Sequence, residues 1–271
     1  MPPVHQLRSP RLTECYTHAE IVLLGCLLGA LALAAFGPAV AQYANYHAFA
    51  DQRGAWGVPH AVDVLSNLPF ALAGVLGLFG VWKQRAVAQV DARWQLITLF
   101  FAGLLVTAVC SGYYHWRPDN AGLAVDRCGM VVAFAGLLGA AVADRVGVRM
   151  GWVVAGLVLF AGPASALVSL YSGNLLPWAV LQGGGVLLVL CLALRAPVPG
   201  AWRLPLLSVI AWYALAKILE LNDHHVFAWT QGLVSGHSLK HVAAALAAWP
   251  VLSVMHNGAQ NQNRKALPQA V

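Results

Sequence analysis

Long apolar stretches separated by short polar breaks dominate the hydrophobic pattern of this chain. A helix needs about 20 mostly apolar residues to cross the hydrocarbon core of a bilayer. The pattern predicts eight such segments, at residues 19–41, 61–82, 94–116, 121–143, 150–172, 175–194, 203–221 and 237–256. The breaks between them are rich in Gly, Pro and Asn, which favour turns. We therefore predict an all-α fold, an integral membrane helical bundle.

Composition supports a membrane protein and argues against a soluble one. The 271 residues are 59% hydrophobic and only 10% charged, whereas about a quarter of a soluble domain is charged. The formal net charge of +6 could indicate an anionic partner, but the basic residues lie in short loops rather than in one run. We therefore expect no nucleic-acid partner and take the basic residues as a topology signal.

The basic residues gather at one set of segment ends. Eleven of the 16 lie there: Arg8, Arg11, Lys83, Arg85, Arg93, Arg145, Arg149, Arg195, Arg203, Arg264 and Lys265. Cytoplasmic loops of membrane proteins carry an excess of Lys and Arg, so both termini are predicted to be cytoplasmic. The loops near 42–60, 117–120, 173–174 and 222–236 then face outward. A short multi-pass chain of this kind is typical of a bacterial inner membrane.

The organisation along the chain is that of one membrane domain. Residues 1–18 are predicted to be a cytoplasmic N-terminal segment, and residues 257–271 a polar cytoplasmic tail. The apolar run 19–41 ends in small residues, so it could be a cleaved signal peptide; its length favours a retained helix. Residues 42–256 then form a seven-helix domain, to which the first helix is an addition.

Five polar residues lie within or at the edge of the apolar segments: Ser111, His115, Asp126, His237 and His241. Polar groups in hydrocarbon cost free energy unless they are partnered, so each needs a reason. Residues four apart share one helical face, which pairs Ser111 with His115 and His237 with His241. The alternation of spans brings the end of the third segment and the starts of the fourth and eighth to the same outward level.

Three neutral imidazole ligands with one open position are typical of a hydrolytic zinc centre. Each residue alone has a simpler explanation. Ser111 could bond to its own helix, Asp126 could cap a helix or pair with Arg127, and His-x-x-x-His arises by chance. The convergence of three separate segments at one depth favours the metal site, with His115, His237 and His241 as the ligands.

The spacing also resembles a known family. Ser-x-x-x-His, an Asp eleven residues after that His and a C-terminal His-x-x-x-His are similar to the pattern of the alkaline ceramidases. These belong to a superfamily of seven-helix membrane proteins that includes adiponectin-receptor-like and haemolysin III-like proteins. The resemblance covers about residues 60–256. It implies that the three histidines bind Zn²⁺ and that Ser111 and Asp126 act beside it.

The chemistry of these residues agrees with the roles that the resemblance implies. A three-histidine zinc lowers the pKa of water toward about 7. Asp126 would accept a proton and return it to the leaving amine, and Ser111 would donate a hydrogen bond to the developing oxyanion. A site in the membrane suits a lipid amide. We therefore predict hydrolysis of ceramide or a ceramide-like lipid to a fatty acid and a long-chain amine.

A calcium site is a further implication of the resemblance, because the ceramidases carry an acidic N-terminal loop that binds Ca²⁺. In this chain the corresponding region offers Asp51, Asp63 and Asn67. Calcium takes six to eight oxygen ligands, so we do not expect it here. Asp63 and Asn67 could instead bond to a neighbouring helix.

Two functions of other classes compete with a hydrolase. A receptor-like or regulatory protein could keep the zinc structurally, and a transporter would place polar residues across the whole membrane depth. The inner halves of the segments hold almost none. Lys217 and Glu220, three residues apart, are predicted to pair, and Lys240 to extend toward the membrane interface. Hydrolysis of another lipid amide or ester is a closer alternative.

Overall fold

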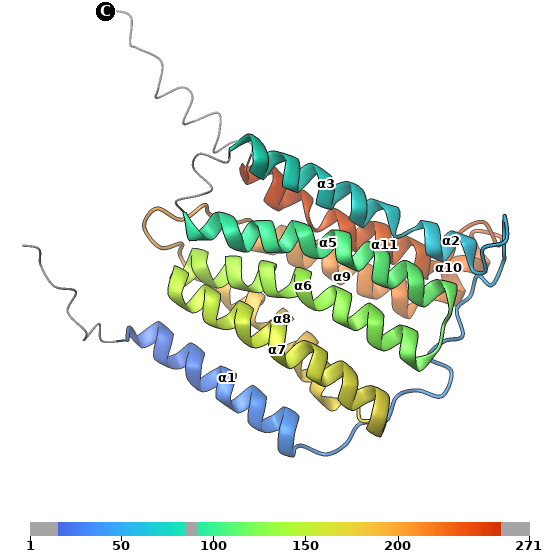
Figure 1. Ribbon diagram of the computed structural model, residues 1–271, viewed down its shortest axis with the longest axis horizontal. Helices are drawn as coiled ribbons and strands as arrows, with labels where there is room; N and C mark the ends of the chain where they lie inside the picture. The colour runs from blue at the N-terminus through green and yellow to red at the C-terminus, as the bar shows by residue number, and fades with distance from the viewer. Residues whose placement is uncertain (1–15, 85–90, 256–271) are drawn as a thin grey trace, which may run out of the picture.

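The computed structural model describes residues 16–84 and 91–255. Its regular elements are helices that run roughly side by side (Figure 1). They are α1 (His18–Phe36), α2 (Ala61–Leu65), α3 (Leu68–Lys83), α5 (Ala92–Trp116), α6 (Asn120–Arg145), α7 (Val148–Ser172), α8 (Leu176–Ala193), α9 (Leu206–Leu221), α10 (Asp223–Trp229) and α11 (Gly236–Leu246). The all-α membrane bundle is confirmed for these residues. The predictions for 1–15 and 257–271 and for Arg85 lie outside them.

Seven segments of the described chain are long and apolar enough to cross a membrane. They match seven of the eight predicted spans: His18–Phe36, Ala61–Lys83, Ala92–Trp116, Asn120–Arg145, Val148–Ser172, Leu176–Ala193 and Gly236–Met255. The difference is α9, which begins only after Pro205 and has 16 residues. At about 24 Å, it is shorter than a typical hydrocarbon core.

Two of the predicted spans are interrupted helices. The segment 61–82 divides at Ser66 and Asn67, just before Pro69 in the first turn of α3. The last span leaves regular helix at 247–248, just before Pro250, and residues 249–255 are helical again. Proline lacks an N–H and clashes with the preceding turn, which accounts for both interruptions. The first one has a consequence for the site, because it places Ser66 at a helix break.

Close packing of α5 against α6 sets the framework of the bundle. A Cβ atom on Gly129 of α6 would lie 2.6 Å from Cys110 Cβ of α5, and Gly103 and Gly136 lie against backbone of the facing helix. Small residues allow membrane helices to approach this closely. α6 also packs against α7 and α8 and is the most buried of the spans. Asp126 is therefore held against the helix that carries Ser111 and His115.

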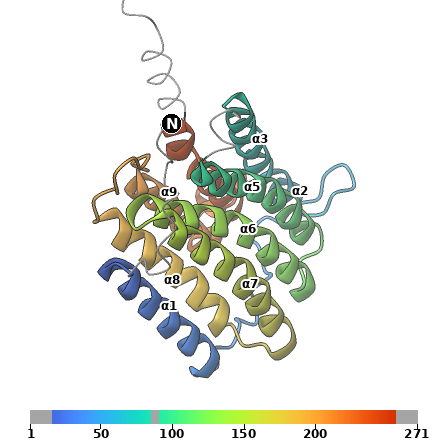
Figure 2. The same cartoon turned by 60° about the vertical axis from the view of Figure 1, so that its left-hand side comes forward.

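The two ends of the bundle differ, and we name them by their residues. The histidine end holds Trp116, Asn120 and Gly236, where α5 ends and α6 and α11 begin; the opposite end holds Arg145 and Val148. α2, α10 and the loop 41–60 lie at the histidine end (Figure 1). α1 packs on the outside of the bundle against α8 (Figure 2).

Candidate metal centre

Three buried imidazoles meet at the histidine end. His115 ends α5, and His237 and His241 lie one turn apart in α11. One nitrogen of each lies within 4.8 Å of the others, and the side chains are 1%, 6% and 4% exposed. His115 Nε2 and His237 Nε2 are 3.3 Å apart. Two unprotonated ring nitrogens cannot bond to each other, so a proton or a cation must lie between them. The predicted convergence is confirmed, and the donor set fits a metal ion such as zinc.

Ser66 orients one of the three rings. Its hydroxyl donates to the Asp63 carbonyl oxygen at 2.7 Å and lies 2.7 Å from His241 Nδ1. Since the hydroxyl hydrogen is used on the carbonyl, Ser66 Oγ accepts from His241 Nδ1–H. This tautomer leaves His241 Nε2 with its lone pair available for a metal. Ser66 reaches the ring because it lies in the break between α2 and α3.

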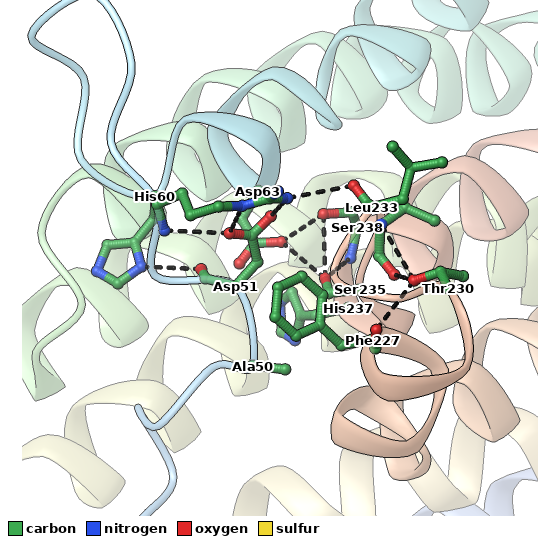
Figure 3. A network of polar contacts seen from close by, with 12 residues as sticks. Ala50, Asp51, His60, Asp63, Phe227, Thr230, Leu233, Ser235, His237 and Ser238 are labelled. Atoms are coloured by element: carbon green, nitrogen blue, oxygen red, sulfur yellow. Dashed lines mark hydrogen bonds and ion pairs between the residues drawn. The ribbon is translucent and has the colours of Figure 1, made fainter.

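A network of carboxylates fixes the start of α11 (Figure 3). Asp63 Oδ1 accepts from Ser238 Oγ at 2.6 Å and from Ser235 Oγ at 3.3 Å. Ser235 also caps the helix, accepting from Ser238 N at 3.0 Å. The His237 backbone N–H donates to Asp223 Oδ1 at 2.8 Å. The position of His237 is therefore set by buried carboxylates on two other segments.

Asp126 and Ser111 are both buried at the histidine end, Ser111 one turn before His115 in α5 and Asp126 in the second turn of α6. Ser111 interacts with the Asp126 carboxyl group, while Asp126 Oδ1 has no hydrogen-bond partner in the described part of the chain. Asp126 interacts electrostatically with Lys240. Among the described residues Arg127 does not pair with Asp126; it bonds to Ser169. Asp126 thus keeps one oxygen available for a proton.

Phe49, from the loop 41–60, packs against two of the three histidines, His115 and His237. Its ring centroid lies 4.8 Å from that of His115 and 4.4 Å from that of His237. The backbone next to it is fixed, since Ala50 N donates to Asp223 Oδ2 at 2.9 Å. Asp223 therefore connects this loop to the start of α11. An apolar ring here keeps water from this side of the site and strengthens electrostatic interactions within it.

The predicted calcium ligands have other contacts. Arg53 donates to both Asp51 oxygens, at 2.8 Å from Nε and 2.6 Å from Nη2, and so holds the pKa of the Asp51 carboxyl below its usual value. Asp63 accepts from the two serines of the α11 cap. Asn67 Nδ2 donates to the Asp63 carbonyl at 2.9 Å, within its own segment rather than to a neighbouring helix. Asp63 Oδ2 and Asn67 Oδ1 have no partner in the described ranges, and the expectation that calcium does not bind here stays a prediction.

The lysines of α9 and α11 give one confirmation and one correction. Lys217 pairs with Glu220, as predicted. Lys240 does not extend to the interface: its ammonium bonds to Glu220 Oε1 at 2.7 Å, and its side chain is 20% exposed. A half-buried carboxylate within reach is a better partner than the distant interface. Glu220 therefore joins two lysines inside the bundle.

Comparison with known proteins adds no relative. The chain matches no family model, and no curated protein or solved structure is significantly similar to it. What is established is a multi-pass membrane bundle with a buried three-histidine cluster that could bind a metal. Sequence reasoning missed Phe49, Ser66 and Asp223. Only Ser66 left a signal, a hydroxyl just before Pro69 within an apolar segment.

Proposed function

We propose that this protein is a zinc-dependent membrane amidohydrolase that cleaves the N-acyl amide of ceramide or a ceramide-like lipid. The products are a free fatty acid and a long-chain amine. One observation carries the proposal: three buried imidazole nitrogens lie within 4.8 Å of one another, at the end of the bundle that also buries the Asp126 carboxyl group and the Ser111 hydroxyl. Within the described residues no Cys, Asp or Glu completes a fourth ligand position. Such an open position is typical of catalytic zinc.

Each polar residue has a distinct task in this proposal. His115, His237 and His241 would hold the metal, which when bound supplies an activated water near neutral pH. Asp126 accepts the proton of that water on its unpartnered Oδ1 and later delivers it to the leaving nitrogen. Ser111 donates its hydrogen to the carbonyl oxygen of the substrate as negative charge develops there.

The surroundings suit a lipid better than a soluble substrate. The site lies at one end of apolar spans, so an acyl chain could stay among the helices while the amide reaches the histidines. We place both termini in the cytoplasm and the histidine end outward, in a bacterial inner membrane. Loop charge supports this orientation.

A receptor-like protein with structural zinc is the main rival. Structural zinc sites usually fill all four positions with protein ligands. The Asp126–Ser111 pair at the same end would have no task in such a site. Both features favour the hydrolase.

The test measures bound metal and turnover on the same protein. The purified chain, supplied with zinc, is incubated with a panel of ceramides and other N-acyl lipids and esters. His237→Ala should lose both zinc and activity, whereas His225→Ala, an exposed histidine at the same end, should keep both. Full zinc occupancy without turnover of any amide or ester would favour the receptor. Absence of zinc from the supplied wild type would end the proposal.

A further inference from the structure

Arg127 is a buried cation with an unused hydrogen-bonding edge. It lies in the second turn of α6 and is 2% exposed. Nη1 donates to Ser169 Oγ at 2.7 Å, and the guanidinium lies over the rings of Trp178 and Tyr46, at 5.2 and 5.8 Å. Nε and Nη2 have no hydrogen-bond partner, and no carboxylate pairs with Arg127 in the described ranges.

Two other arginines show what this edge usually does. In Arg53, Nε and Nη2 donate side by side to the two oxygens of Asp51. In Arg145, Nε donates to Leu192 O, Nη2 to Leu204 O, and Nη1 to Asp144. The unused edge of Arg127 is thus the one with which Arg53 binds a carboxylate. This geometry fits a planar carboxylate or two oxygens of a phosphate.

Packing alone is a poor explanation for Arg127. A guanidinium does not lose its proton in a protein, so its burial carries the full cost of a charge. The two aromatic rings offset part of that cost by cation–π attraction. They do not satisfy the N–H groups on the remaining edge. An oxyanion would satisfy both the charge and the two donors.

Arg127 lies at the same end of the bundle as the candidate site. Arg127 follows Asp126 directly and interacts with it electrostatically. Tyr46, which lies over the guanidinium, belongs to the loop 41–60 and is half-buried. Tyr46 also interacts electrostatically with Lys240. The guanidinium therefore lies against one side chain of the covering loop, at the histidine end of the bundle.

We propose that Arg127 binds the oxyanion of a lipid ligand, a carboxylate or a phosphate held by Nε and Nη2 after Tyr46 moves aside. Where this rests on the proposed function, it narrows the substrate class to ceramide-like N-acyl lipids that carry a carboxylate or phosphate group. Binding itself does not depend on hydrolysis. The two parts can therefore be tested separately.

The experiment compares amphiphiles of matched chain length in non-ionic micelles. The probes are N-lauroylglycine, dodecyl phosphate and neutral N-lauroylethanolamine, and binding is measured by native mass spectrometry. Wild type should bind at least one acidic probe more tightly than the neutral one. Arg127→Gln should weaken acidic binding about tenfold or more and leave the neutral probe unchanged. Arg127→Lys keeps the charge without the paired donors, so its affinity for the acidic probes should lie between those of wild type and Arg127→Gln. Ser169→Ala, which retains the free edge, should behave like wild type.

Zinc content and melting temperature report whether each variant folds. If Arg127→Gln does not fold, the proposal is tested by the Arg127→Lys variant and by the preference of wild type for acidic over neutral probes. Equal binding of acidic and neutral probes, or unchanged acidic binding in a folded Arg127 variant, would overturn the oxyanion site. Arg127-dependent binding without turnover supports that site and counts against the hydrolase. Turnover of neutral amides, together with unchanged binding of the acidic probes in Arg127→Gln, would support the hydrolase and overturn the oxyanion site.

Discussion

Both ends of this bundle bury charged side chains, but one end leaves far more buried polar atoms without a hydrogen-bond partner than the other. At the opposite end, Asp144 accepts from Arg203 N at 2.9 Å, from Leu204 N at 3.1 Å and from Arg145. At the histidine end the described chain leaves six buried atoms without a partner: Asp63 Oδ2, Asn67 Oδ1, His115 Nδ1, Asp126 Oδ1, Arg127 Nε and Arg127 Nη2. Arg93 Nε is the one such atom in the described residues of the opposite end.

This difference separates structure from function within one fold. A buried polar network with every group paired makes a helix end rigid. Native proteins leave few buried polar atoms unpaired, so a cluster of them calls for a ligand or a reaction. The contacts at the opposite end therefore have a structural role: they join α6 to α8 and to the segment before α9. The histidine end reads as a site.

Asp126→Asn is expected to give the largest effect, a loss of turnover without a loss of zinc or stability. The amide keeps the shape of the carboxyl group but cannot accept the water proton, so turnover should fall by about 10²–10⁴. Zinc content and melting temperature should stay near wild type, because Asp126 is not among the three ligands. Metal analysis and single-turnover kinetics check this. Activity within a few fold of wild type would remove Asp126 from the mechanism.

Asp144→Asn should show the opposite pattern. It leaves Arg145 buried without its anion, which typically costs about 3–5 kcal/mol. Unfolding in mixed micelles of increasing SDS should reveal this loss, whereas zinc content and turnover per folded molecule stay unchanged. A stable variant that loses zinc instead would show that the two ends are coupled.

Ser66→Ala tests the support of the metal rather than the metal itself. Without Ser66 Oγ, His241 Nδ1–H loses its acceptor, and zinc affinity should fall about 10–100-fold. Competition with a chelator measures the change. Ser253→Ala is a matched control, since Ser253 also donates to a carbonyl three residues back, at 2.8 Å, but bonds to no histidine among the described residues. Equal zinc affinity in the two variants would contradict the role of Ser66.

The sequence allowed the coarse frame and the central residues to be predicted for physical reasons. Hydrocarbon thickness and helix periodicity decide spans, and the cost of a polar group in lipid singles out Ser111, Asp126 and the histidines. The contacts of Phe49 and Asp223 could not be predicted, because both depend on how an irregular loop folds back over the bundle. The prediction that Lys240 extends to the membrane interface was wrong for a related reason: its partner Glu220 lies on another helix.

The loop over the histidine end gives the smallest expected effect and a pH dependence of known sign. Arg53 lowers the pKa of Asp51 below its unfolded value, so the ion pair stabilises the fold fully above about pH 4. That contribution is lost as the pH falls through the lower folded pKa. Asp51→Asn should therefore melt below wild type at pH 6, and the gap should close toward pH 3. The other acidic groups, and the release of zinc in acid, affect the melting temperature of both proteins and therefore cancel in the difference between them. If the difference in melting temperature stays constant with pH, Asp51 stabilises the loop through its packing and not through its charge. The loop over the histidine end would then not depend on the ion pair with Arg53.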